Sequence, residues 1–239
     1  MARALFAPSV LGADPLSIGA AVDSLGGNFD WLHVDVMDGH FVPNISFGPG
    51  MVKALRKRYP EAFLDVHLMV DDADVLLSDF VEAGASQISV HAEAEPQLLH
   101  SRLSRIRGAG LRAGVAIAPP TLVEQLRFVL AIADTVMVMS VTPGFGGQGL
   151  IEETLEKTRD LVRLRAVEGY GYRIQMDGGI NLENVARVAA AGCDVFVMGS
   201  AVFGGPDPAG YLAEARNRVQ GCSDPIKLKK EAPVDVRFR

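Results

Sequence analysis

The stretch His33-Val34-Asp35-Val36-Met37-Asp38-Gly39 places an imidazole and a carboxylate two residues apart at the end of an apolar segment. In a β-strand, side chains at positions i and i+2 leave by the same face, so we expect His33 and Asp35 to point to one place. A second histidine, His67, and a second aspartate, Asp177, also stand at the ends of apolar segments. These four groups predict a metal site if the strand ends meet.

The chain alternates between short apolar segments and segments with the apolar spacing of helices. We expect strands at residues 5–9, 31–35, 63–67, 87–91, 114–118, 135–140, 173–177 and 194–198. We expect helices at residues 16–25, 50–58, 73–83, 97–107, 122–131, 151–167, 182–191 and 208–219. The units are about 25 to 35 residues long, as strand-then-helix repeats require.

Eight such units predict an α/β fold, a single (β/α)8 TIM barrel over residues 1–220. An open, doubly wound sheet is the alternative. We prefer the barrel because polar residues collect at the carboxyl ends of the strands, and only a barrel brings all those ends to one rim. Residues 221–239 are rich in lysine and arginine and poor in apolar residues, so we interpret them as a flexible tail or an intersubunit arm.

Composition limits the class of protein. The 239 residues are 49% hydrophobic and 22% charged, which suits one sizeable core. Two cysteines do not indicate a disulfide framework, and no signal-peptide core or membrane-spanning apolar run is apparent, so we expect a cytoplasmic protein without a membrane partner. The net charge of −6 argues against nucleic acid but not against a small anionic substrate. We also expect a homo-oligomer.

A strand-end histidine taken alone is commonly a structural, hydrogen-bonded group. Two imidazoles and two carboxylates at one rim are different, because burying them without a partner would be costly. Mixed nitrogen and oxygen ligands favour one divalent ion: Zn²⁺, Fe²⁺, Mn²⁺ or Co²⁺. We interpret His91, at another strand end, as a structural or supporting histidine. His40 and His100 have no evident role.

Glycine-rich turns follow the last three expected strands. They contain Gly144, Gly146 and Gly147, then Gly178 and Gly179, then Gly199 beside Ser200. Glycine lets backbone N–H groups approach an anion, and the loops after the last strands of barrels commonly bind phosphate. The turns therefore predict a phosphate site, with residues 142–149 long enough to form a lid. The alternative is that they only connect strand to helix.

Methionines also lie near the expected rim. Met37 and Met69 follow candidate ligands by two residues, Met139 lies near the end of its strand, and Met176 precedes Asp177. Such residues more often fill a core. On a face shared with ligands, they would exclude water from a charged intermediate without offering a proton, which suits carbanion chemistry.

The segments 33–44, His67-Leu68-Met69, 143–148 and Asp177-Gly178-Gly179-Ile180 resemble the signatures of the ribulose-phosphate 3-epimerase family, and the resemblance runs from about residue 6 to residue 203. It implies an isomerase of the pentose phosphate pathway that interconverts D-ribulose 5-phosphate and D-xylulose 5-phosphate with a divalent metal. By this likeness His33, Asp35, His67 and Asp177 are ligands, and Asp35 and Asp177 are also the catalytic acid and base. Two carboxylates suit this reaction, because inverting a carbon beside a ketone removes a proton from one face and returns one to the other.

The substrate-binding residues predicted from the rim and the resemblance are Ser9, Met37, His67, Met69, Met139, Gly144, Gly146, Gly147, Gly178, Gly179, Gly199 and Ser200. Ala118, Thr142 and Gln175 depart from the family pattern. They leave open another ketose phosphate, such as D-allulose 6-phosphate. A barrel lyase with the same metal and phosphate sites and a non-catalytic, partner-binding barrel are further alternatives.

Overall fold

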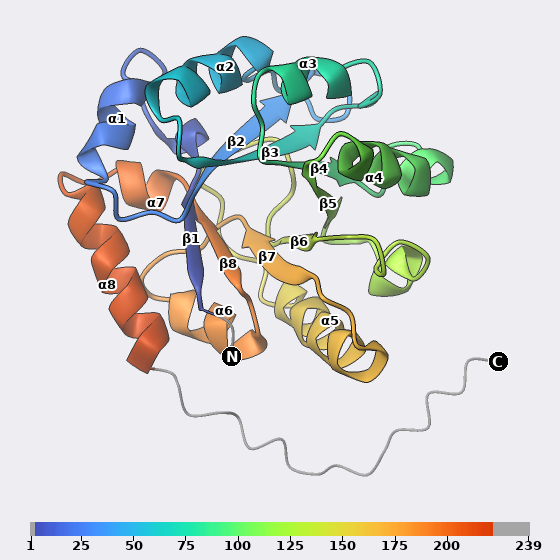
Figure 1. Ribbon diagram of the computed structural model, residues 1–239. Helices are drawn as coiled ribbons and strands as arrows, with labels where there is room; N and C mark the ends of the chain where they lie inside the picture. Colours follow the sequence, from blue (N-terminus) through green and yellow to red (C-terminus); the bar gives the residue numbers. More distant parts are fainter. Residues whose placement is uncertain (1–2, 222–239) are drawn as a thin grey trace.

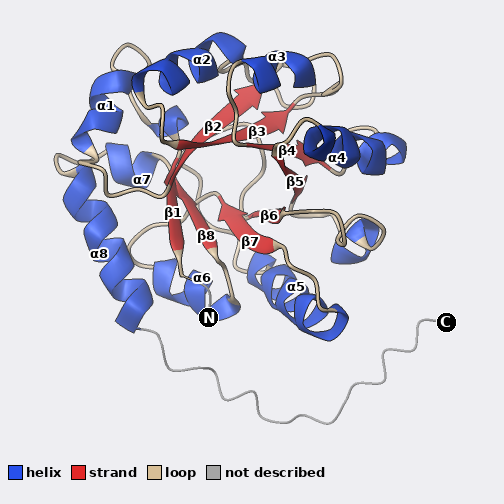
Figure 2. Cartoon of the chain, viewed as in Figure 1, coloured by secondary structure: helices blue, strands red, loops and turns tan. Residues whose placement is uncertain are grey.

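The computed structural model describes residues 3–221, in which eight parallel strands form a barrel surrounded by helices (Figures 1 and 2). The strands are β1 (Leu5–Pro8), β2 (Trp31–Met37), β3 (Phe63–Met69), β4 (Gln87–His91), β5 (Arg112–Ile117), β6 (Thr135–Met139), β7 (Arg173–Asp177) and β8 (Val195–Met198). The helices are α1 (Ile18–Ser24), α2 (Pro49–Arg58), α3 (Leu77–Glu82), α4 (Leu99–Gly108), α5 (Thr154–Glu168), α6 (Val185–Ala191), α7 (Ser200–Phe203) and α8 (Pro208–Gly221). Three short 3₁₀ helices lie at Val10–Gly12, Pro96–Leu98 and Val123–Leu126.

The order of strands is β1-β8-β7-β6-β5-β4-β3-β2, so the predicted (β/α)8 barrel is confirmed and the open doubly wound sheet is excluded. Between β1 and β2 the barrel is closed by a parallel bridge from Ser9 to His33 and by a 2.9 Å hydrogen bond from the N–H of Asp30 to the carbonyl of Phe6. Because every strand runs the same way, all carboxyl ends share one rim.

Alternation along each strand separates two layers. In β2, Leu32, Val34 and Val36 belong to the main apolar core, which also includes helix residues such as Val52 and Leu55 of α2. The intervening residues point into the barrel. Continuous burial of β2 is typical of a parallel strand that is covered on both faces.

The middle of the barrel is polar. The Asp65 carboxylate lies 2.7 Å from His33 Nδ1 and accepts hydrogen bonds from Gln87 Nε2 at 2.8 Å and Gln175 Nε2 at 2.6 Å. Gln87 Oε1 in turn accepts from Thr135 Oγ1 at 2.7 Å. All five side chains are fully buried. Among the described residues, only Gln175 Oε1 is a buried side-chain polar atom without a hydrogen-bond partner.

The amino-terminal end of the barrel is closed by stacked rings. The Trp31 and Phe63 rings lie with centroids 4.5 Å apart, and the guanidinium of Arg112 lies within 6 Å of both. This cation over two aromatic faces seals the end opposite the rim.

One predicted helix is wrong. Residues 122–131 contain only the 3₁₀ turn Val123–Leu126 and the turns that follow it, in which the carbonyl of Leu126 accepts from the N–H groups of both Val129 and Leu130. Val123, Leu126, Val129 and Leu130 are buried, whereas Phe128 is 85% exposed. Most of the backbone hydrogen bonds here join residues three apart, which is the pattern of tight turns rather than of an α-helix. The short helix α7 was not predicted.

Strand and helix ends also differ from expectation. β2 and β3 continue two residues beyond their predicted ends, because Met37 and Met69 pair in register. Met176 does not lie at the rim, since it packs in the outer core where Thr158 Oγ1 contacts its sulfur at 3.2 Å. The tail predicted at residues 221–239 lies outside the described residues except for Gly221. Within residues 3–221, no helix has both the length and the apolar character to span a membrane.

The polar layer generates a stability prediction. Thr135→Val removes the donor to Gln87 and leaves a buried acceptor unpaired, which should cost about 1–3 kcal/mol in the free energy of unfolding. Thr158→Val is the matched control, because Thr158 is equally buried but donates only to a sulfur, a weak acceptor; its cost should be below about 1 kcal/mol. Urea denaturation measures both, and equal losses would contradict the prediction.

Candidate metal centre and active site

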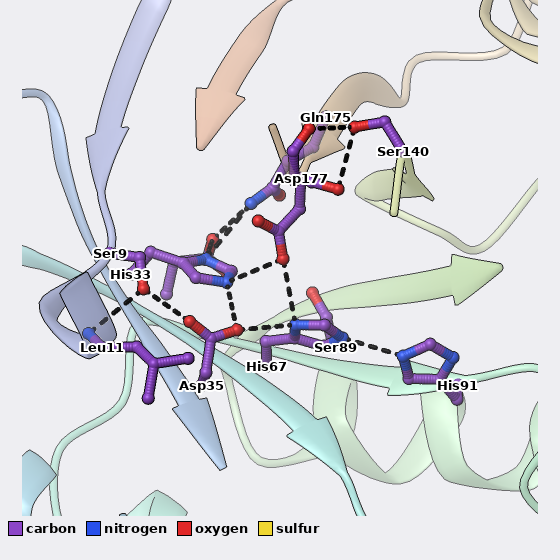
Figure 3. Close-up of polar contacts among 12 residues, drawn as sticks. Ser9, Leu11, His33, Asp35, His67, Ser89, His91, Ser140, Gln175 and Asp177 are labelled. Carbon is purple, nitrogen blue, oxygen red and sulfur yellow. Dashed lines mark hydrogen bonds and ion pairs between the residues drawn. The ribbon is translucent and has the colours of Figure 1, made fainter. Parts of the chain in front are cut away.

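Four side chains from three strands meet inside the rim: His33 and Asp35 of β2, His67 of β3 and Asp177 of β7 (Figure 3). Each offers one ligand atom, and these atoms all lie within 4.8 Å of one another. The register explains part of the meeting, because Asp35 and His67 are direct neighbours on β2 and β3. The barrel brings Asp177 in from the opposite side.

The contacts point at a common centre. Asp35 Oδ1 lies 3.2 Å from both His33 Nε2 and His67 Nδ1. Asp177 Oδ2 lies 3.7 Å from the first nitrogen and 3.5 Å from the second. The two imidazoles are fully buried, whereas the Asp177 side chain is 13% exposed. The carboxylates therefore lie between the imidazoles and the solvent-facing cavity.

Each imidazole is held from behind by another buried group. Asp65 lies 2.7 Å from His33 Nδ1, so His33 presents Nε2 to the cluster. His67 presents Nδ1, and its Nε2 lies 2.9 Å from His91 Nε2. His91 Nδ1 lies 2.9 Å from the carboxylate of Glu93.

Electrostatics in the cluster favour charged pairs. Burial alone would lower the pKa of His33, but the charges of Asp35 and Asp65 outweigh it and raise this pKa well above its ordinary value. The pKa of His67 is also raised, since hydrogen bonds to Asp177 and Asp35 outweigh its burial. Burial would raise the pKa of Asp35, but the two imidazoles lower it.

His91 and Glu93 lie behind His67, and the pKa of His91 is shifted in the opposite sense to that of His67. Burial lowers the pKa of His91 and so favours its neutral form. Burial would raise the pKa of Glu93, but its hydrogen bonds with His91, Thr121 and the N–H of Ala118 hold it at about 2.

The donor set fits a divalent metal. Two borderline imidazole nitrogens and two hard carboxylate oxygens form a mixed donor set that suits Zn²⁺, Fe²⁺, Mn²⁺ or Co²⁺. Both histidines carry a hydrogen bond on the ring nitrogen that faces away from the cluster, as metal-binding histidines almost always do. The cluster can therefore hold a metal ion.

A cavity of about 280 Å³ opens above the cluster. Asp35 and Asp177 line it, together with every predicted substrate-binding residue except His67, which lies beneath the carboxylates. Their role in binding substrate stays a prediction. The lining also includes residues that were not predicted: Leu11, Gly12, Val141, Pro143, Phe145, Gln148, Ile180, Asn181, Val197 and Ala201. Neither Ala118 nor Thr142 lines this cavity, as far as the described residues show.

Two glycines of the cavity wall are required by close approach. Gly178 has φ +115°, and a Cβ there would lie 2.3 Å from Val141 Cγ2. Gly179 has φ +67°, and a Cβ there would lie 2.4 Å from the backbone nitrogen of Leu150. Any other residue would strain this turn, so the backbone itself forms the wall.

Side-chain hydrogen bonds hold the loop over the cavity, residues 142–149, in one conformation. Gln148 Nε2 donates to the carbonyls of Thr142 and Phe145, and Asn44 Nδ2 donates to the carbonyl of Gly144 at 2.9 Å. Ser9 lies at the mouth as predicted, but its hydroxyl donates to Asp35 Oδ2 at 2.5 Å. Ser9 therefore orients a carboxylate as well as lining the cavity.

The sequence indicated His91 only as a structural or supporting histidine, without its partner, and did not single out Glu93. A signal was present, because Gln87, Ser89 and His91 alternate on β4 and therefore share the interior face. His40 lies exposed in a loop and His100 on the exposed face of α4, away from the cluster.

A model of the ribulose-phosphate 3 epimerase family matches residues 5–203. The chain belongs to this family. Proteins named ribulose-phosphate 3-epimerase from Serratia marcescens and Synechocystis are 44% and 45% identical to it over 210 and 216 residues. These alignments cover 87% and 88% of this chain and 99% and 92% of the relatives.

Solved structures outside the epimerase family share its fold. A 3-hexulose-6-phosphate synthase from Salmonella typhimurium superposes with a TM-score of 0.70 at 19% identity, covering 91% of this chain and 99% of that one. A 3-keto-L-gulonate-6-phosphate decarboxylase from Vibrio cholerae gives 0.68 at 15% identity, covering 92% and 98%. At these identities the likeness shows the barrel alone.

The pKa shifts predict how metal binding depends on pH. Because the pKa values of His33 and His67 are raised in the fold, protonation of these imidazoles stabilises the metal-free protein. This contribution is complete below the unfolded histidine pKa of about 6.5 and is lost as pH rises through the raised values. A metal requires the neutral imidazoles. The increase in Tm on adding Zn²⁺ should therefore be larger at about pH 8.5 than at about pH 6.

Differential scanning fluorimetry at fixed free Zn²⁺ measures this increase. His100→Gln is the control, since this exposed histidine should leave the pH dependence unchanged. An increase in Tm that is the same at both pH values would contradict the competition between protons and metal.

Proposed function

We propose that the protein is a metal-dependent epimerase that inverts carbon 3 of a ketose phosphate, D-ribulose 5-phosphate to D-xylulose 5-phosphate. The observation that carries the proposal is the pair of carboxylates, Asp35 and Asp177, which line one cavity above two buried histidines. Membership of the epimerase family and the names of the relatives support it. We also expect a cytoplasmic homo-oligomer that needs neither nucleic acid nor membrane.

The reaction requires two proton transfers. One carboxylate takes the proton from carbon 3, and the electrons of the broken C–H bond move toward the neighbouring carbonyl to give an enediolate. The other carboxyl group, which begins the step protonated, returns its proton to the opposite face of carbon 3, so that the configuration inverts and no atom is gained or lost. Asp35 of β2 and Asp177 of β7 are the two groups that would act as base and acid.

His33, Asp35, His67 and Asp177 would hold one divalent ion, whose identity among Zn²⁺, Fe²⁺, Mn²⁺ and Co²⁺ depends on geometry and supply. When bound, such an ion supplies positive charge that stabilises an oxyanion. Ser9 keeps Asp35 in place through its hydrogen bond. Met37, Met69 and Met139 form an apolar wall that excludes water and offers no competing proton.

The substrate phosphate fits the glycine-rich side of the cavity. Within residues 3–221, the lining contains neither lysine nor arginine. The charge of a phosphate would then be met by neutral donors, chiefly backbone N–H groups together with polar side chains of the lining such as the Ser200 hydroxyl. The turns at 144–147, Gly178–Gly179 and Gly199 allow the close approach that such binding requires.

Solvent-hydrogen exchange tests the proposed reaction. Metal-loaded protein incubated with D-ribulose 5-phosphate in D₂O should form xylulose 5-phosphate that carries deuterium at carbon 3, detected by NMR and mass spectrometry. D-allulose 6-phosphate, assayed in parallel, tests the alternative ketose. Absence of exchange with both sugars would contradict the proposal, and a shorter-chain product would indicate the lyase.

Carboxylate substitutions test the catalytic pair. Asp35→Asn and Asp177→Asn should each lower kcat by at least about 10³-fold, because an amide cannot accept or return the proton. Asp71→Asn is a matched control, since Asp71 follows β3 near the rim but is exposed and outside the cluster. Turnover by either site variant at the rate of the control would exclude that residue as acid or base.

A further inference from the structure

A line of three buried or half-buried side chains leads away from the metal cluster: His67, His91 and Glu93 (Figure 3 shows the two histidines). The two imidazole rings stack with centroids 5.1 Å apart at 26°, and their Nε2 atoms are 2.9 Å apart. A contact this short between two ring nitrogens is a hydrogen bond only if one nitrogen carries the proton. The direction of that hydrogen bond decides which nitrogen of His67 is free for a metal.

The Glu93 carboxylate decides the direction of the hydrogen bond between the two imidazoles. Glu93 can only accept, so His91 Nδ1, which lies 2.9 Å from Glu93 Oε2, must carry a proton. A neutral His91 then has its lone pair on Nε2 and accepts from His67 Nε2–H. A neutral His67 has its own lone pair on Nδ1, the nitrogen that faces Asp35 and Asp177.

Glu93 is itself held in one orientation. Its Oε1 accepts from the N–H of Ala118 at 2.7 Å and from the Thr121 hydroxyl, which leaves Oε2 for His91. Lys157 of α5 donates to the carbonyls of Ala118 and Thr121 at 2.9 and 2.6 Å, so it fixes the segment that holds Glu93. The segments that follow β4 and β5 therefore hold the Glu93 carboxylate in place.

We propose that Glu93, acting through His91, is a positioning residue that keeps His67 in the tautomer with Nδ1 free for a divalent cation. The two candidate histidine ligands would then bind through different nitrogens. Asp65 on His33 Nδ1 leaves Nε2 to bind, whereas His91 on His67 Nε2 leaves Nδ1 to bind. The proposal rests on the metal site of the proposed function but not on the sugar or the reaction.

Glu93→Gln tests the direction of the line. Two donors already occupy Oε1, so the amide oxygen should take their side and turn its NH₂ toward His91 Nδ1. His91 would then carry its proton on Nε2 and donate to His67, which moves the His67 proton to Nδ1 and blocks the metal. We expect the Kd for Zn²⁺ to rise about 10- to 100-fold. Glu124→Gln, an exposed glutamate in the next turn, is the matched control.

Two substitutions of His91 separate positioning from packing. His91→Leu removes the acceptor for His67 Nε2–H and should raise the Kd for Zn²⁺ about 10-fold or more. His91→Gln places an amide oxygen near the position of Nε2 and should keep the Kd within about threefold of wild type. A purely structural role for His91 would not produce this rescue.

Zn²⁺ affinity is measured by competition with a chelator, and ¹⁵N-histidine NMR of the Zn²⁺-loaded protein identifies the protonated nitrogen of each ring. The expected wild-type spectrum shows His67 with its proton on Nε2 and His91 with its proton on Nδ1. Unchanged Zn²⁺ affinity in both Glu93→Gln and His91→Leu would overturn the proposal and leave the metal site intact. Wild-type protein that binds no Zn²⁺ would overturn the metal site as well.

Discussion

The Asp65 carboxylate in the middle of the barrel is the group on which the site depends. A fully buried charge is costly unless it is paired and hydrogen-bonded, and Asp65 meets that requirement with His33, Gln87 and Gln175. These partners come from β2, β4 and β7, so one carboxylate joins four strands across the interior. It also orients His33 toward the cluster, which couples the polar interior of the fold to the geometry of the candidate metal centre.

Much of this arrangement was predictable from the sequence. Alternation within the stretch that begins at His33 indicated which side chains share a face, and eight regular units indicated a barrel, which is confirmed. Because parallel strands place their carboxyl ends at one rim, His67 and Asp177 could be assigned to the same place as Asp35 without knowledge of the register. Their roles in catalysis stay predictions.

What the sequence could not show depends on contacts between strands. Spacing made residues 122–131 resemble a helix, but most of the backbone hydrogen bonds there close tight turns between residues three apart. The supporting role of His91 was predicted without its partner, since only the packing of β3 against β4 brings it onto His67. The choice of ring nitrogen at each histidine has no sequence signal, because it depends on partners such as Asp65 and Glu93 that lie far along the chain or outside any recognised pattern.

The backbone wall around Gly178 and Gly179 has an evolutionary consequence. Where peptide N–H groups bind an anion, binding depends on the path of the backbone and not on the identity of side chains. Substitutions elsewhere can accumulate as long as they leave that path unchanged. At the few positions that have no room for a Cβ, no residue other than glycine can replace the one present without moving the backbone.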